Sequence, residues 1–300
     1  MALRSVAELM AACEISQKPL WEVILMQDLE IDTPEARTVS MQRMDHMWSI
    51  MCASVKNYDK EQHSFSGLVG GDGARYLDAM QSGNMMCGHY FNLAIATALK
   101  VSECNACMKR IVAAPTAGSC GVIPAALIPY QEEYHTTKED MLHALYVAGG
   151  FGNIIAERAS ISGAEAGCQA EIGAASAMAA AALTFLCGGT PEACENACAM
   201  ALKNLLGLVC DPVAGLVEVP CVKRNVVGVV NAIACANMAI AGITSRIPAD
   251  EVIDAMGDIG RHMPETLRET AAGGLAVTPT AQKVVERFSK TKNNFYKKLF

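Results

Sequence analysis

The stretch EIGAASAMAAAALTFLC, residues 171–187, carries one charged side chain, that of Glu171 at its first position. Alanine dominates the rest, so apolar side chains would fall on every side of a helix built from it. A segment that is apolar all round is typical of a helix buried in a protein core or a membrane. It is short for a membrane span, which needs roughly 20 predominantly apolar residues. We therefore predict a buried helix whose small side chains let neighbouring helices approach closely.

A second apolar stretch, residues 226–243, does reach the length of a membrane span. It contains Asn231 and Asn237, however, and it is rich in alanine and glycine rather than in large apolar residues. We predict that this segment is also a helix buried all round inside the protein, and we expect no contact with a membrane.

Helical patterns cover most of the remaining chain. Pro34 after Thr33 suits the first turn of a helix behind its capping residue, and Thr136 three residues before Glu139 forms a capping-box pattern. Further helices are expected within residues 3–57, 74–107 and 191–206, and from about 122, 226, 248 and 280. Loops rich in glycine or proline are expected at 64–73, 113–121 and 207–225.

No part of the chain shows the sustained period-two alternation that indicates strands, and no repeat of 20–50 residues is present. The sequence therefore predicts an all-α fold. We expect a single large helical domain over residues 1–300, with buried Ala/Gly-rich helices and structured glycine/proline loops. The one internal boundary that the pattern allows would set apart a minor N-terminal helical subdomain, residues 1–60.

The composition restricts the classes of partner. Of 300 residues 52% are hydrophobic and 18% are charged, which favours a large core over disorder. The net charge is −7 and no basic run interleaved with aromatic residues occurs, so we expect no nucleic-acid partner. Thirteen cysteines and the lack of a signal-peptide pattern at the start favour a reducing cytoplasm. There, cysteines are more often metal ligands, catalytic groups or buried thiols than disulfides.

Three cysteines lie beside turn-forming residues. Cys168 follows Gly167, while Cys210 and Cys221 flank a loop in which Asp-Pro follows the first cysteine and Pro220 precedes the second. Thiolates hold iron–sulfur clusters, and their reduction potentials depend on hydrogen bonds to the cluster sulfurs. The spacing does not match the usual ferredoxin run, and buried cysteines in tight turns are equally compatible with it. From the spacing alone, both interpretations remain open.

Three segments, residues 114–124, 163–173 and 209–221, resemble the iron–sulfur L-serine dehydratases, and specifically the α chain of the two-chain bacterial form. The resemblance covers essentially the whole chain. It implies an all-helical catalytic domain that takes part in amino-acid degradation and gluconeogenesis by converting L-serine to pyruvate and ammonia. It also implies that Cys168, Cys210 and Cys221 bind a [4Fe–4S] cluster whose fourth iron is open to substrate and acts as a Lewis acid.

The resemblance also implies a second polypeptide. Single-chain members of that family carry an additional domain with a Ser-Ser-His-Thr motif and a C-terminal cysteine, and this sequence contains neither. We therefore expect a β chain, in a heterodimer or larger assembly, to complete the site. The general base would come from that chain, or from Glu165 or Lys223 of this one.

The substrate carboxylate needs hydrogen-bond donors. The segment from Thr116 to Gly121 offers hydroxyls and free backbone amides at a predicted helix start, and Arg224 adds positive charge beside Cys221. We predict that Thr116, Gly118, Ser119, Gly121 and Arg224 bind substrate. A purely structural turn and a local salt bridge are the alternatives for these residues.

Other residues and other functions compete with this hypothesis. Cys104 with Cys107, and Cys194 with Cys198, are predicted to be buried thiols, because no second pair with zinc-site spacing is present. His89 and His143 are predicted to be core histidines. The competing functions are a related cluster-dependent lyase acting on threonine or cysteine, a pyridoxal-phosphate lyase using Lys223, and an electron-transfer or structural metal subunit.

Overall fold

The computed structural model describes residues 4–83 and 85–288, and these residues form α-helices, short helical turns and loops without a β-strand. The all-α prediction is confirmed. The longer helices are α1 (Val6–Ser16), α2 (Leu20–Asp28), α3 (Pro34–Lys56), α4 (Asp72–Gln81), α5 (His89–Ala106), α6 (Val122–Tyr134), α7 (Lys138–Arg158), α9 (Ala174–Leu186), α10 (Pro191–Lys203), α11 (Cys221–Ile240) and α12 (Ala249–His262).

Shorter elements lie between them and after them. They are η1 (Ala117–Ser119), α8 (Gly163–Ala166), η2 (Gln169–Gly173), η3 (Val213–Gly215), η4 (Glu265–Leu267) and η5 (Gly274–Val277), and residues 279–288 form a further helical stretch. Of these, η2 is a single π-helical turn that runs directly into α9. Such π turns inside helices are rare and occur frequently at functional sites.

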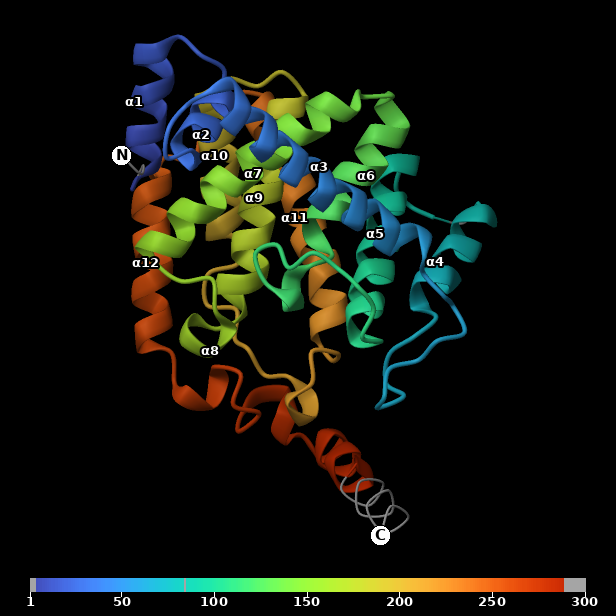
Figure 1. The fold of residues 1–300 in the computed structure, drawn as a ribbon. Coiled ribbons are helices and arrows are strands. Elements are labelled where there is room, and N and C mark those ends of the chain that lie inside the picture. The colour runs from blue at the N-terminus through green and yellow to red at the C-terminus, as the bar shows by residue number, and fades with distance from the viewer. Residues whose placement is uncertain (1–3, 84, 289–300) are drawn as a thin grey trace.

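The alanine-rich helix α9 is the centre of the fold. It packs against α6, α7, α10 and α11, which surround it in Figure 1. Its residues from Ala174 to Thr184 are all buried, as predicted. The polar groups in this core have partners: the Ser176 hydroxyl donates to the Gly228 carbonyl at 2.8 Å, and the Asn231 side-chain amide donates to Ser176 Oγ at 2.9 Å. Burial of these groups is tolerated because each is hydrogen-bonded.

The predictions for α11 need two corrections. The helix begins at Cys221 rather than near Val226. It is also not buried all round, because Lys223, Val227, Ala234 and Asn237 lie on an exposed face. The length and composition of a segment do not show how many neighbours its helix has. Because α11 packs against other helices on one side only, its other side is exposed.

One stretch in the described part of the chain, Gln169–Leu186, is long and apolar enough to cross a membrane, and 83% of it is buried inside the protein. That degree of burial is typical of a helix in a protein core. The stretch joins η2 to α9 and has protein neighbours on all sides, which agrees with the prediction for residues 171–187.

The N-terminal helices share the main core. Trp48 of α3 and Leu9 of α1 belong to the same buried cluster as Phe151 of α7 and Ile253 of α12. The boundary expected near residue 60 is therefore crossed by apolar contacts, and the division of the chain into domains stays a prediction.

Two predicted helix starts have different outcomes. Thr33 caps α3 by accepting from the amide of Ala36, and Pro34 opens the helix, as expected. Thr136 does not cap α7. That role belongs to the next residue, Thr137, whose hydroxyl accepts from the amide of Asp140 at 3.1 Å.

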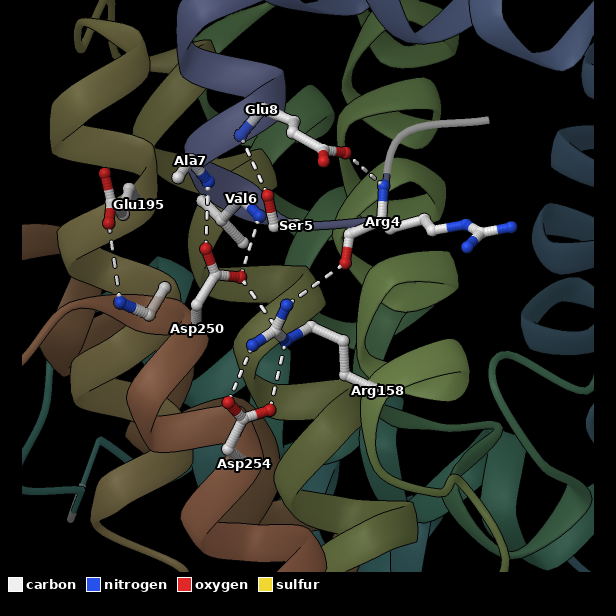
Figure 2. A network of polar contacts seen from close by, with 10 residues as sticks. Arg4, Ser5, Val6, Ala7, Glu8, Arg158, Glu195, Asp250 and Asp254 are labelled. Atoms are coloured by element: carbon white, nitrogen blue, oxygen red, sulfur yellow. Dashed lines mark hydrogen bonds and ion pairs between the residues drawn. The ribbon is translucent and has the colours of Figure 1, made fainter. Parts of the chain in front are cut away.

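Asp250, in the first turn of α12, joins this helix to the start of α1 (Figure 2). Its carboxylate accepts from the backbone amides of Val6 at 2.8 Å and Ala7 at 3.0 Å, which are free donors at the start of α1. Arg158, at the end of α7, lies 3.6 Å from the same carboxylate and pairs with Asp254 at 2.7 Å. Asp250 therefore works as a cap supplied from another part of the sequence.

Asp250→Ala should lower the free energy of unfolding by about 0.5–2 kcal/mol, the usual loss when a helix cap is removed. Urea unfolding of the full chain measures this. The matched control is Asp258→Ala on the same helix, whose partners Arg261 and His262 are exposed, and it should change stability by no more than about 0.5 kcal/mol. Equal losses in the two variants would contradict the capping role.

Candidate metal centre

The three cysteines singled out by the sequence come from three different local structures. Cys168 immediately precedes η2, Cys210 lies in an extended segment, and Cys221 is the first residue of α11. All three are buried, with exposed fractions of 2%, 2% and 6%, and none forms a disulfide. In Figure 1 the segments that carry them, together with α8, gather at the lower end of the bundle.

Cys168 and Cys210 converge with a carboxylate. One ligand atom from each of Cys168, Glu171 and Cys210 lies within 4.8 Å of the other two, and Glu171 Oε2 is 4.0 Å from Cys210 Sγ. No other such group of histidine, cysteine or acidic side chains occurs among the residues that the structure describes. Two sulfur donors and one carboxylate oxygen are a chemically suitable donor set for a transition metal.

Cys221 is not one of the three residues whose ligand atoms converge, but it feels the charges of two of them. Burial raises the pKa of the Cys221 thiol to about 12, and the negative charges of Cys168 and Glu171 add to that increase. A hydrogen bond from Cys210 lowers the pKa of Cys168, and the same contact raises the pKa of Cys210. The thiols are therefore close enough to influence one another, and Cys168 is the one that most readily becomes a thiolate.

Glu171 has an environment unusual for a carboxylate. Desolvation raises its pKa, while the hydrogen bond from Thr116 opposes the increase. The Thr116 hydroxyl donates to Glu171 Oε1 at 2.7 Å. A Cβ atom at Gly163 would lie 2.7 Å from Glu171 Oε2, and one at Gly118 would lie 3.0 Å from Oε1. The space for this carboxylate therefore depends on two glycines.

Arg224 lies beside the cysteines and fixes the loop between them. Its guanidinium donates to the Val209 carbonyl at 2.7 Å and to Asp211 at 2.8 Å, and it is close enough to Cys168 to favour the thiolate. Both hydrogen-bonded nitrogens are thus engaged with protein. The local salt bridge left open as an alternative is present, and a role in binding substrate stays a prediction.

A segment after α12 covers the Cys210 loop. The amide of Cys210 donates to the Leu267 carbonyl at 2.8 Å, and the amide of Glu269 donates to the Cys210 carbonyl at 2.8 Å. Asp211 accepts from the amide of Leu275 at 2.8 Å. These bonds attach the first residues of the cysteine loop, which runs from Cys210 to Cys221, to residues 265–277.

The predicted substrate-binding turn lies next to the cysteines. Thr116 and Ser119 cap η1 reciprocally, and Asn225 of α11 accepts from the Gly121 amide at 2.9 Å and donates to the Gly118 carbonyl at 2.8 Å. These contacts place the turn against Glu171 and against the helix that begins at Cys221. Whether it binds substrate stays a prediction.

Glu165 and Lys223, the predicted bases, point elsewhere. Glu165 is exposed and accepts from Ser160 at 2.6 Å. Lys223 is 74% exposed and pairs with Asp72 at 3.1 Å. The structure therefore does not bring either side chain into the cysteine group.

Sequence reasoning missed two carboxylates at this end of the molecule. Glu171 lies three residues after Cys168, a spacing that places two side chains on one face of a helix, and this signal was available. Glu218, in the loop between Cys210 and Cys221, is buried and accepts from Ser64 and Ser66. It joins the glycine-rich loop 64–73 to the cysteine loop, a contact that no local pattern indicates.

The remaining cysteines and histidines have mixed outcomes. Cys104, Cys194 and Cys198 are buried thiols as predicted, and Cys107 is partly buried. His143 is largely buried and stacks on Trp21, with ring centroids 3.6 Å apart. The prediction for His89 is wrong: its side chain is 65% exposed and pairs with Glu133, because it stands at the first position of α5.

Comparison with known proteins gives consistent matches. A family model described as the serine dehydratase alpha chain matches residues 5–276. The chain is 49% identical over 284 residues to the probable L-serine dehydratase alpha chain of Bacillus subtilis (strain 168), covering 95% of this chain and 94% of that protein. It is 39% identical over 289 residues to the L-serine dehydratase alpha chain of Peptoniphilus asaccharolyticus, with 96% and 99% covered. The L-serine dehydratase of Streptomyces coelicolor is 46% identical over 182 residues, 60% of this chain but 40% of that protein.

Gly121→Ala should destabilise the protein. The added Cβ would lie 2.5 Å from Ser102 Oγ and 2.8 Å from the Ala98 carbonyl oxygen, which belongs to the backbone of α5 and cannot easily move. Such overpacking costs about 1–3 kcal/mol, measurable by urea unfolding. As a control, Gly149→Ala in α7 meets no atom within 4 Å and should raise stability by about 0.5–1 kcal/mol. A stabilised Gly121→Ala protein would show that the turn packs less closely than described.

Proposed function

Because the chain belongs to the serine dehydratase alpha-chain family, we propose that it is an L-serine ammonia-lyase, which converts L-serine to pyruvate and ammonia. The observation that carries this proposal is the match over nearly the full length of relatives named as L-serine dehydratase alpha chains. The convergence of buried, unbridged cysteines at one end of the bundle supports it.

The residues at this end fit an iron–sulfur cluster. We propose that Cys168, Cys210 and Cys221 hold a [4Fe–4S] cluster, because thiolates are its usual protein ligands. The three thiols are buried and free of disulfides, and Gly163 leaves room beside Cys210, where a Cβ would lie 3.2 Å from its sulfur. When bound, a cluster with one iron free of cysteine would supply a Lewis acid for the hydroxyl and carboxylate of serine.

The chain's own residues would bind and orient the substrate. We propose that Thr116, Ser119 and Arg224, which lie near the cysteines, bind the substrate carboxylate. To do so they would exchange part of their present hydrogen bonds to protein groups. Because the three cysteines are buried, a cluster that they hold would be shielded from water on the side of this chain. Loss of the Cα proton and of the β-hydroxyl gives aminoacrylate, which tautomerises and hydrolyses to pyruvate and ammonia. The Cα proton needs a base within hydrogen-bond reach.

A second chain would supply that base. Glu165 and Lys223 are engaged at the surface, away from the cysteine group. The relatives that match over their full length are named as alpha chains, and this chain matches only 40% of the longer L-serine dehydratase of Streptomyces coelicolor. We therefore propose that a β chain docks over the cysteine group, in a heterodimer or larger assembly that acts in the cytoplasm.

The alternatives have less support. A pyridoxal-phosphate lyase would need Lys223 free to form a Schiff base, whereas it is paired with Asp72. Threonine or cysteine as substrate is a closer alternative, since side-chain selection would involve the partner chain. The relatives' names favour serine.

Replacing the cysteines tests the cluster. Protein prepared without oxygen should contain about four irons per chain, and Cys168→Ala, Cys210→Ala or Cys221→Ala should each lose most of them. Iron and acid-labile sulfide are measured chemically. Cys104→Ala and Cys194→Ala are matched controls, because both remove a buried thiol outside the group, and both should keep the iron. Loss of iron only in the controls would reject the ligand assignment.

Adding the partner tests the division of the active site. The chain purified alone should bind the cluster but form little pyruvate from serine, because no base reaches the Cα proton. Co-purification with the β chain should raise pyruvate formation by about 10²–10⁴-fold, the usual contribution of a positioned acid–base group. Threonine and cysteine are assayed alongside to rank the substrates. Full serine turnover by the chain alone, with no partner detected by mass spectrometry, would overturn the proposal of a second chain.

A further inference from the structure

We propose that Glu171 supplies the fourth protein ligand of the cluster when substrate is absent, through its carboxylate oxygen Oε2. This inference rests on the proposed function, because it assumes that the cysteine group holds a cluster. It adds an exchangeable oxygen ligand to the three thiolates, and it assigns a role to a carboxylate that the family resemblance and the comparisons leave without one.

The position of the carboxylate is the first support. Its ligand atom shares with Cys168 and Cys210 the one close group of possible metal ligands among the described residues, with all separations within 4.8 Å. Oε2 is the oxygen that faces Cys210 Sγ, at 4.0 Å. Carboxylate oxygen is a common metal ligand, and it is held less tightly by a soft, thiolate-ligated iron than sulfur is. An oxygen ligand here would therefore be one that a substrate can replace.

The way the carboxylate is held is the second support. Thr116 donates to Oε1 at 2.7 Å, which uses that oxygen and turns Oε2 towards the thiols. Gly163 and Gly118 leave open the two positions where a Cβ would touch the carboxylate. Metal-ligating carboxylates are commonly oriented by such hydrogen bonds from neighbouring residues. The arrangement fixes one oxygen for ligation and reserves the other for orientation.

The charge balance is the third support. Glu171 is largely buried beside thiols, and no side chain in the described part of the protein forms an ion pair with it. The nearest cation, Arg224, is committed to Asp211 and to the Val209 carbonyl. A buried carboxylate is costly unless it is paired or coordinates a metal. A cluster iron would supply the missing positive partner.

Spectroscopy of the full chain with its cluster tests the inference without measuring activity. The labile iron is exchanged for ⁵⁷Fe under anaerobic conditions, and Mössbauer spectra are recorded without and with serine. The dissociation of the labile iron is followed by the electron paramagnetic resonance signal of the three-iron form after mild oxidation. Glu171→Gln should change the serine-free spectrum and speed the loss of the labile iron by at least about 10-fold, because even an outer-shell partner of a metal site contributes about 10- to 100-fold to metal affinity. Spectra of the serine-bound forms should agree.

Two further variants make the result specific. Glu195→Gln is the control, because Glu195 is a half-buried carboxylate whose pKa is also raised by desolvation, and it lies on α10 outside the cysteine group. This control should match the wild type. Thr116→Val keeps the carboxylate but removes the bond that orients it, and it should give a smaller increase in iron loss. Thr116→Val also tests the ligand role if the Glu171→Gln protein does not fold.

The outcomes separate this inference from the proposed function. Wild-type protein that binds no iron would reject both. Suppose that the wild-type chain holds four irons and turns serine over once the β chain is added. If its Glu171→Gln and Thr116→Val variants then keep the wild-type spectrum and iron-loss rate, only the ligand role is overturned. In that case Glu171 would instead be a group that contacts the substrate ammonium or a structural one.

Discussion

The close packing around α9 is the constraint on which the other features depend. Its alanines have no exposed surface, and four helices approach it at the distance that these small side chains allow. Protein interiors are packed as densely as organic crystals, so a larger side chain at these positions would have to displace a neighbouring helix. Cys168 and Glu171 belong to the turn that leads into this helix. The candidate metal centre is therefore attached to the most enclosed element of the fold through Cys168 and Glu171.

The other parts of the centre reach it from distant points in the sequence, and buried polar contacts set their positions. Arg224, on the first turn of the helix that begins at Cys221, binds Asp211, which follows Cys210. This pair fixes the loop between the two cysteines and their relative position. A buried ion pair is weak evidence for stability, because desolvation of both charges offsets their attraction. The contribution of the Arg224–Asp211 pair is to position the two thiols. Without this pair, the thiols would lie at the ends of a loop that can adopt many conformations.

Much of the fold could be predicted from sequence, because it depends on local composition. The choice of three cysteines came from the family resemblance rather than from their spacing, and their role as ligands stays a prediction. The run of alanines at 174–182 indicates a buried helix whatever surrounds it, and turn-forming residues mark the cysteine loop. What could not be predicted depends on distant partners. The exposed face of α11 reflects which helices are absent from one side, and the cap that Asp250 provides reflects contacts across nearly the whole chain. His89 was misjudged because apolar neighbours in sequence do not show that a helix start lies at the surface. Glu171 was within reach of local reasoning, since its spacing from Cys168 is helical, but its importance depends on Cys210, which only the fold brings close.

The contact between α1 and α12 has a consequence for how the protein is made. The amide of Val6 finds its acceptor on Asp250, 244 residues further along the chain. At the usual synthesis rate of about 5–20 residues per second, α1 leaves the ribosome some 10–50 s before that acceptor exists. During this interval it is an 11-residue helix, a length that is marginal in water without tertiary packing. The first helix to be synthesised therefore lacks this cap until most of the chain has been made, and before then α2 and later α10 are its packing partners.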